Sequence, residues 1–122
     1  MILVATDAPL GDRNLERLAK RAMLGLARAG GIASNGSGDY VIAFSTAEAN
    51  RIPYRPVQVM QKEELHNDRI TGLFQACIDA TEEAIINSLF AAETMEGMHG
   101  KTSALPVDKV IKRLKEQQII KE

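Results

Sequence analysis

Cysteine, net charge and long apolar runs are all scarce in this sequence of 122 residues. The single cysteine, Cys77, excludes an internal disulfide framework and is typical of a reducing compartment, so we expect a cytoplasmic protein. Fifteen basic residues against sixteen acidic ones leave a net charge of -1, without the basic excess expected of a nucleic-acid partner. No apolar run approaches the roughly 20 residues that span a bilayer, so we expect no membrane partner either.

A metal centre and a secretory signal are also missing from the pattern. The two histidines, His66 and His99, have no clustered carboxylates or thiols beside them and do not form a zinc-binding motif. The apolar opening at residues 1–5 is short and has no basic start, unlike a signal peptide. The remaining balance, 45% hydrophobic and 25% charged residues, is that of an ordinary soluble globular protein.

The apolar pattern along the chain predicts a mixed fold. The unbroken, β-branched run at residues 2–5 is typical of a strand that is buried on both faces. The other expected elements are a helix at residues 12–29, a strand at 40–46, a long helix at 67–94 and a last helix that begins near residue 107. The expected fold class is therefore α/β (α+β), with two strands, or three if residues 57–59 form one.

The number of expected strands is small for the apolar surface that the helices present. A helix over residues 67–94 would be about 42 Å long at ~1.5 Å per residue. An isolated two-stranded sheet is marginal in water. We therefore expect that the chain either forms oligomers or lacks a large piece of its sheet.

Residues 30–38 form a glycine-rich segment immediately before the strand at 40–46. Three interpretations of it remain open. Asn-Gly-Ser-Gly at residues 35–38 is typical of a turn. Backbone N–H groups of such a loop can also hold an anion, although neither phosphate-binding glycine motif is present. The third interpretation is that Ser37 is a nucleophile.

The chemistry of the third interpretation follows from the neighbours of Ser37. Gly36 and Gly38 leave the Gly36 carbonyl open to attack by the Ser37 hydroxyl, and an N-to-O acyl shift would make Ser37 a new N-terminus. A free α-amino group has a pKa of about 7.7–8.0, so it can act as the general base for its own hydroxyl. The local sequence by itself does not distinguish this nucleophile from a turn.

Four separated blocks stand out along the sequence: Ala-Thr-Asp-Ala-Pro-Leu at residues 5–10 together with Arg-Leu-Ala-Lys-Arg-Ala at 17–22, Asn-Gly-Ser-Gly-Asp at 35–39, Ala-Thr-Glu-Glu-Ala-Ile at 80–85, and Ala-Leu-Pro at 104–106. Together they resemble the DmpA-type aminopeptidases, the family of L-aminopeptidase/D-amino-acid esterases and β-peptidyl aminopeptidases. The blocks occur in the family's order and cover nearly the whole chain, so the set is specific where a single Gly-Ser-Gly would be weak.

The resemblance implies a serine N-terminal nucleophile hydrolase with an αββα sandwich, of which this chain would be the C-terminal part. Residues 1–122 would form one partial domain. Autoproteolysis between Gly36 and Ser37 would leave residues 1–36 as the end of an α chain and 37–122 as the β chain. The resemblance further implies an aminopeptidase that acts on peptides or on amino-acid amides and esters, assembles as a homo-oligomer and needs no metal or organic cofactor.

The resemblance also implies roles for residues beside the nucleophile Ser37. Glu82 matches the family's glutamate, which would hold the terminal ammonium group or the serine. The family has a serine two residues before that glutamate, where this sequence has Ala80. Thr81, next to it, is therefore the candidate hydroxyl partner.

The oxyanion donor matches the family less well. The family's asparagine aligns with Asp7, and an ionised carboxylate cannot donate a hydrogen bond to an oxyanion. Asn35, next to the cleavage site, is the alternative donor. The earlier strands and pocket residues of the family's α chain are absent from this sequence. A second hypothesis is therefore that the chain is a truncated, non-catalytic remnant that folds as an oligomer or with a missing α chain.

Overall fold

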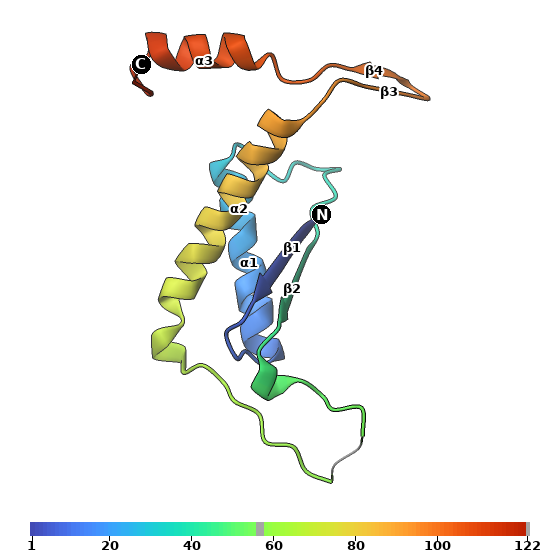
Figure 1. The fold of residues 1–122 in the computed structure, drawn as a ribbon, viewed down its shortest axis with the longest axis vertical. Coiled ribbons are helices and arrows are strands. Elements are labelled where there is room, and N and C mark those ends of the chain that lie inside the picture. Colours follow the sequence, from blue (N-terminus) through green and yellow to red (C-terminus); the bar gives the residue numbers. More distant parts are fainter. Residues whose placement is uncertain (56–57, 122) are drawn as a thin grey trace. The chain divides into compact units, whose positions relative to one another are not determined.

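Residues 1–55 and 58–121 are described by a computed structural model (Figure 1). They fall into two units, Met1–Glu83 and Ala84–Glu122. The first unit contains β1 (Ile2–Thr6), α1 (Asp12–Arg28), β2 (Val41–Ser45), the short 3₁₀ turns η1 (Glu48–Asn50) and η2 (Asn67–Arg69), and most of α2 (Thr71–Ala91). The second contains the end of α2, β3 (Met95–Gly97), β4 (Gly100–Thr102) and α3 (Val107–Glu116).

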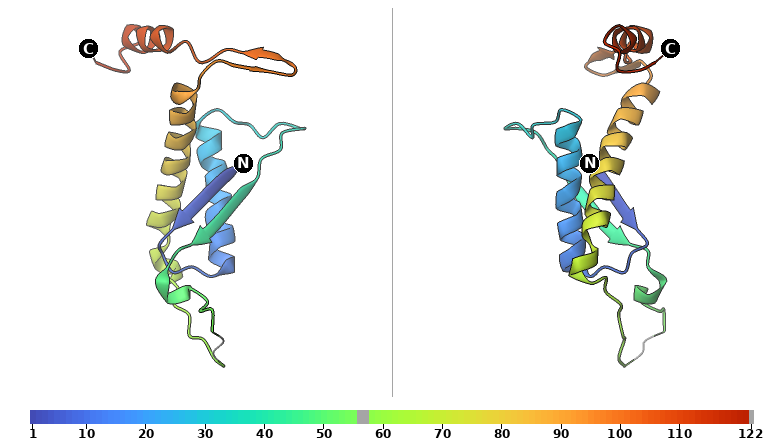
Figure 2. Two further views of the ribbon diagram at one scale, coloured as in Figure 1. Left: turned by 45° about the vertical axis from the view of Figure 1, so that its right-hand side comes forward. Right: turned by 90° about the vertical axis from the view of Figure 1, so that its left-hand side faces the viewer.

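The first unit is built on a parallel pair of strands. β1 and β2 pair in register from Ile2 opposite Val41 to Thr6 opposite Ser45. Parallel strands need a crossover connection, and α1 provides it (Figure 2). The apolar residues of α1 recur every three or four positions, and this stripe brings Leu18 and Ala22 into the core with no exposed surface.

The two faces of this sheet differ. Ile2, Val4 and Val41 pack against the core, on the face that the helices cover. On the opposite face, Leu3 and Ile42 are 63% and 51% exposed. The expectation that residues 2–5 are buried on both faces is therefore wrong. Side chains alternate along a strand, and within the described residues only one face of this sheet is covered.

The core joins α1 to the start of α2. Its buried apolar residues are Leu10, Leu18, Ala22, Ile70, Phe74 and Cys77. The two helices approach closely at Gly25, where a Cβ atom would lie 2.6 Å from the Ile78 carbonyl oxygen and 2.7 Å from Thr81 Cβ. Glycine is therefore required sterically at this crossing, although it is a weak helix former.

Asn14 is a buried polar residue that ties α1 to the segment before α2. Its Nδ2 donates to Glu64 Oε1 at 2.6 Å, and its Oδ1 accepts a hydrogen bond from Arg17 at 2.8 Å. The backbone N–H of Leu65 donates to the Pro9 carbonyl beside this network. These bonds attach the last part of the connection between β2 and α2 to the body of the unit.

Most of the predicted elements are confirmed, with shifted boundaries. The helix at 12–29 and the strand at 40–46 correspond to α1 and β2. The long helix begins at Thr71 instead of residue 67, because residues 67–69 form η2, which His66 caps by accepting from the Asp68 N–H. Its end at Ala91 precedes the expected residue 94.

The strand count differs from the expected two or three. Within the described residues there are four short strands, because β3 and β4 form an antiparallel hairpin that the sequence pattern did not indicate. The short strand expected at residues 57–59 is not found: Val57 lies outside the described residues, and Gln58 and Val59 are not in a strand. The mixed fold class α/β (α+β) is confirmed.

Candidate active site

The glycine-rich segment contains a tight turn at Ser34–Ser37. The backbone N–H of Ser37 donates to the Ser34 carbonyl at 2.8 Å, and Gly36 has a φ of 95°. A positive φ at the third residue of a four-residue turn is the type II arrangement, for which glycine is preferred. The turn interpretation is therefore correct, and it leaves the nucleophile interpretation open, since the Gly36–Ser37 bond lies on the turn.

Ser37 is exposed, and its hydroxyl group has one hydrogen-bond partner among the residues that the structure describes. Its Oγ donates to Asp39 Oδ2 at 2.6 Å. All residues from Ile32 to Tyr40 are exposed, so nothing in the described part of the chain covers the Gly36–Ser37 bond. The sequence pattern did not assign a role to this acidic partner, although it lies only two residues after the serine.

Thr81 lies inside the crossing between α1 and α2 and is only 6% exposed. Its hydroxyl donates to the Cys77 carbonyl at 2.7 Å, one helical turn back. A hydroxyl has one proton to donate, and the helix backbone already accepts this one. Burial raises the pKa of the Cys77 thiol, and the nearby Thr81 hydroxyl opposes that shift.

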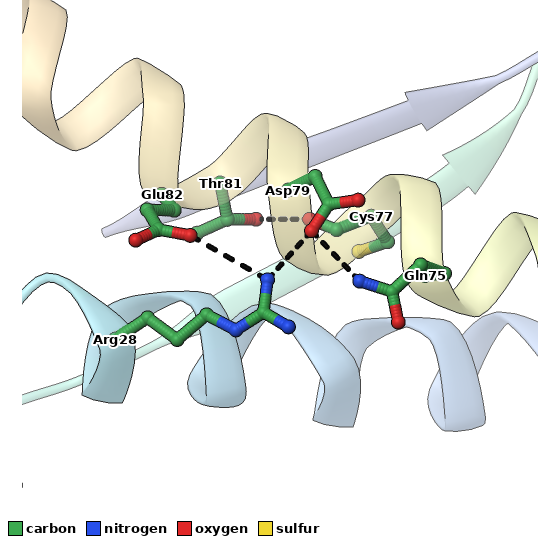
Figure 3. A network of polar contacts seen from close by, with 6 residues as sticks. All are labelled: Arg28, Gln75, Cys77, Asp79, Thr81 and Glu82. Atoms are coloured by element: carbon green, nitrogen blue, oxygen red, sulfur yellow. Dashed lines mark hydrogen bonds and ion pairs between the residues drawn. The ribbon is translucent and has the colours of Figure 1, made fainter.

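Glu82 is held by a residue from the other side of the candidate cleavage site (Figure 3). Nη1 of Arg28, at the end of α1, lies 3.5 Å from Glu82 Oε2 and 2.6 Å from Asp79 Oδ1. Gln75 Nε2 also donates to Asp79 at 2.7 Å. Arg28 therefore connects the segment before Ser37 to the helix after it, and this role was not foreseen from the sequence.

The elements bring Ser37 and Glu82 to the same end of the first unit without joining them directly. The loop to Ser37 leaves α1 just after Arg28, which is the residue that contacts Glu82. Figure 1 shows this loop beside the chain's N-terminus, at the end of the unit where β2 begins. The observed partner of Ser37 is Asp39, whereas those of Thr81 and Glu82 are Cys77 and Arg28.

The two candidate oxyanion donors occupy different ends of the strand pair. Asn35 is exposed in the turn, two residues before Ser37. Asp7 follows the last residue of β1, at the end of the pair where Thr6 meets Ser45. Ser37 precedes the opposite end, where Ile2 meets Val41. Asp7 lies five residues beyond Ile2 along an extended strand, which separates it from that opposite end by roughly 16 Å. Asp7 is therefore too far away to contact an oxyanion formed at Ser37.

Two further observations concern cofactors and membranes. Within residues 1–55 and 58–121, the structure brings together no group of three or more histidine, cysteine, aspartate or glutamate side chains suited to a metal ion. In the same part of the chain, no helix combines the length and apolarity needed to cross a bilayer.

Sequence comparisons identify relatives across most of the chain. Residues 1–103 match the model of peptidase family S58. The chain is 48% identical over 102 residues to the β-peptidyl aminopeptidase BapA of Sphingosinicella microcystinivorans. The match covers 84% of this chain but 26% of that relative, so the chain spans about a quarter of its length.

Solved structures of aminopeptidases also resemble this chain over most of its length. The L-aminopeptidase D-Ala-esterase/amidase of Ochrobactrum anthropi, described as a prototype serine aminopeptidase and a variant of the Ntn hydrolase fold, superimposes with a TM-score of 0.85 at 33% identity. A β-aminopeptidase from Burkholderia sp. superimposes with a TM-score of 0.70 at 31% identity. These matches cover 96% and 93% of this chain, but 33% and 34% of the two structures.

Proposed function

Because the chain belongs to peptidase family S58, we propose that it is part of a serine aminopeptidase of the N-terminal nucleophile type. In this proposal it cleaves itself between Gly36 and Ser37 and then hydrolyses peptides or amino-acid amides and esters. The observation that carries the proposal is the tight turn at Ser34–Ser37. Its glycine has a positive φ, and it presents an exposed serine hydroxyl next to an unhindered peptide bond.

The proposed reaction uses the same hydroxyl twice. First, Ser37 attacks the Gly36 carbonyl, and the C–N bond breaks to give an ester and the free serine α-amino group. Hydrolysis of that ester then frees the Ser37 hydroxyl. That amine then takes the hydroxyl proton when Ser37 attacks a substrate carbonyl, which forms an acyl-enzyme and releases the rest of the substrate as the amine or alcohol. Water hydrolyses the acyl-enzyme and frees the N-terminal residue. No metal ion or organic cofactor takes part in this scheme.

Three further residues have supporting roles in the proposal. Glu82 holds the terminal ammonium group of the substrate or of Ser37, Thr81 supplies a hydroxyl and Asn35 donates to the oxyanion. In the structure, Glu82 is paired with Arg28 and the Thr81 hydroxyl with the helix backbone. The Thr81 hydroxyl must therefore release the helix backbone to donate in the active form, whereas the Glu82 carboxylate can accept a further hydrogen bond while it is paired with Arg28. Asp7 has no role, since it lies at the other end of the strand pair.

The two products of self-cleavage would stay together as one partial domain. Residues 1–36 contribute Leu10, Leu18 and Ala22 to the core, and residues 37–122 contribute Ile70, Phe74 and Cys77. Assembly into a homo-oligomer is also part of the proposal, and the exposed apolar face at Leu3 and Ile42 supports it. A cytoplasmic location, supported by the single free cysteine, completes it.

A non-catalytic remnant is the competing function. It is favoured by the face of the sheet that the described residues leave uncovered, at Leu3 and Ile42. In this alternative the 122 residues fold as an oligomer or with a missing α chain and hydrolyse nothing.

Intact-mass measurement and N-terminal sequencing of the purified full chain distinguish the two functions. Self-cleavage gives a fragment that begins Ser-Gly-Asp, and Ser37→Ala abolishes it together with any hydrolysis of aminoacyl p-nitroanilides. Ser34→Ala is the matched control in the same turn, because it keeps Ser37 and the Ser34 carbonyl. A wild-type chain that stays intact and hydrolyses no substrate establishes the remnant.

A further inference from the structure

The first step of self-cleavage requires a base that the mature enzyme does not need. Before cleavage the nitrogen of Ser37 is part of a peptide bond, and an amide nitrogen does not accept the hydroxyl proton. We propose, on the premise of the function above, that Asp39 is the general base for this step. Its Oδ2 lies 2.6 Å from Ser37 Oγ and accepts the hydrogen that must leave.

The geometry around Ser37 suits this role. A distance of 2.6 Å is typical of a hydroxyl that donates to a carboxylate and is within the range required of a general base. The turn holds the nitrogen of the Gly36–Ser37 bond through its bond to the Ser34 carbonyl. Since Asp39 is two residues from Ser37, the pair depends on local backbone and needs no other part of a larger protein.

The other candidate residues contact different partners. Glu82 is bound by Arg28, and the Thr81 hydroxyl is a donor to the Cys77 carbonyl inside the helix crossing. Asp39 is the carboxylate in contact with the nucleophile. The resemblance to known aminopeptidases supplied no role for it.

Self-cleavage between Gly36 and Ser37 consumes one water molecule and needs no other co-reactant. Asp39 takes the proton of Ser37 Oγ while the oxygen attacks the Gly36 carbonyl carbon, and a C–O bond forms. The C–N bond then breaks, and the proton passes from Asp39 to the leaving nitrogen, which becomes the α-amine. Water then hydrolyses the ester to give the Gly36 carboxylate and the free Ser37 hydroxyl.

Asp39→Asn tests the base because it keeps the size and hydrogen-bonding oxygen of the side chain and removes the carboxylate. We expect self-cleavage of the full chain, followed by intact mass, to slow by about 10²-fold, at the low end of general-base effects because the site is exposed. Asp39→Glu should restore part of the rate. Asp108→Asn in α3 is the matched control and should cleave at the wild-type rate. Normal cleavage in Asp39→Asn overturns the proposal.

Hydroxylamine separates the two stages of cleavage, since it attacks the ester directly. If Asp39 acts in the acyl shift, hydroxylamine does not restore the rate of Asp39→Asn. Full restoration would move its role to ester hydrolysis and overturn the proposal. Equal unfolding midpoints of wild type and Asp39→Asn are also expected, because a merely structural role would lower the midpoint.

Chemical labelling of Ser37 tests the role of Asp39 independently of self-cleavage and of aminopeptidase activity. Diisopropyl fluorophosphate phosphorylates an activated serine: Oγ bonds to phosphorus, fluoride leaves and the base takes the proton. In the uncleaved chain, peptide mapping should show labelling of Ser37 at least 10-fold faster in wild type than in Asp39→Asn. Such labelling in a chain that never cleaves supports Asp39 while the proposed function fails. Equal labelling of the two proteins overturns the role of Asp39.

Discussion

Gly25→Ala should destabilise the first unit, against the usual effect of alanine in a helix. Alanine is a better helix former than glycine by about 1 kcal/mol, so substitution in an unobstructed helix stabilises it. Here the new methyl group would lie 2.6 Å from the Ile78 carbonyl oxygen and 2.7 Å from Thr81 Cβ. Neither atom can move by a side-chain rotation, because one is backbone and the other is attached directly to it.

The change in stability is the cost of the two close contacts less the gain in helix propensity. Overpacking of a well-packed contact costs about 1–3 kcal/mol, and we expect the upper part of that range, about 2–3 kcal/mol, because both distances here are shorter than Cβ atoms tolerate. After the propensity gain is subtracted, we expect the free energy of unfolding to fall by about 1–2 kcal/mol. The separation of α1 from α2 should also increase and expose more of Thr81.

Gly72→Ala is the matched control, because Gly72 is also helical and a Cβ atom there would meet nothing within 4 Å. It should raise stability by up to about 1 kcal/mol, or less because it lies in the first turn. Urea denaturation of both variants, followed by far-ultraviolet circular dichroism, measures the two changes. If Gly25→Ala is as stable as wild type while Gly72→Ala is stabilised, the argument for a tight helix crossing is refuted.

Two further predictions concern single side chains. Asn14→Ala should cost about 1–3 kcal/mol, because it removes the hydrogen bond that the buried Asn14 side chain donates to the Glu64 carboxylate. Arg28→Ala should cost roughly 0.2–1 kcal/mol, and less at high salt, because its ion pairs are partly exposed. Urea denaturation at low and high salt checks the order, and a larger loss for Arg28→Ala would contradict it. The pKa of Cys77 is raised above 9.0 by burial, so the native state keeps a proton that the unfolded state loses. The stability of the wild type should therefore fall as the pH rises above 9, and the stability of Cys77→Ala should fall less. Urea midpoints of both proteins between pH 7 and pH 10 measure this difference, and parallel curves for the two would contradict it.

Patterns that are local in the chain predicted the correct elements. The spacing of Leu15, Leu18 and Ala22 indicated α1, and the apolar, β-branched run at residues 40–46 indicated β2. The hairpin of β3 and β4 was missed because its three-residue strands are too short to show periodicity. The start of α2 was misplaced because Asn67 and Asp68, which look like helix caps, form a 3₁₀ turn instead.

The sequence by itself determined the mixed fold class, the place of the glycine-rich segment around Ser37 and the likeness to the aminopeptidase family. These depend on residue order and on short-range periodicity, which the chain carries wherever it folds. Only the tertiary structure decided that Leu3 faces outward, that Gly25 is where the helices meet and that Glu82 is bound to Arg28. Contacts of this kind depend on which distant segments become neighbours, and the pattern within one segment does not contain that information.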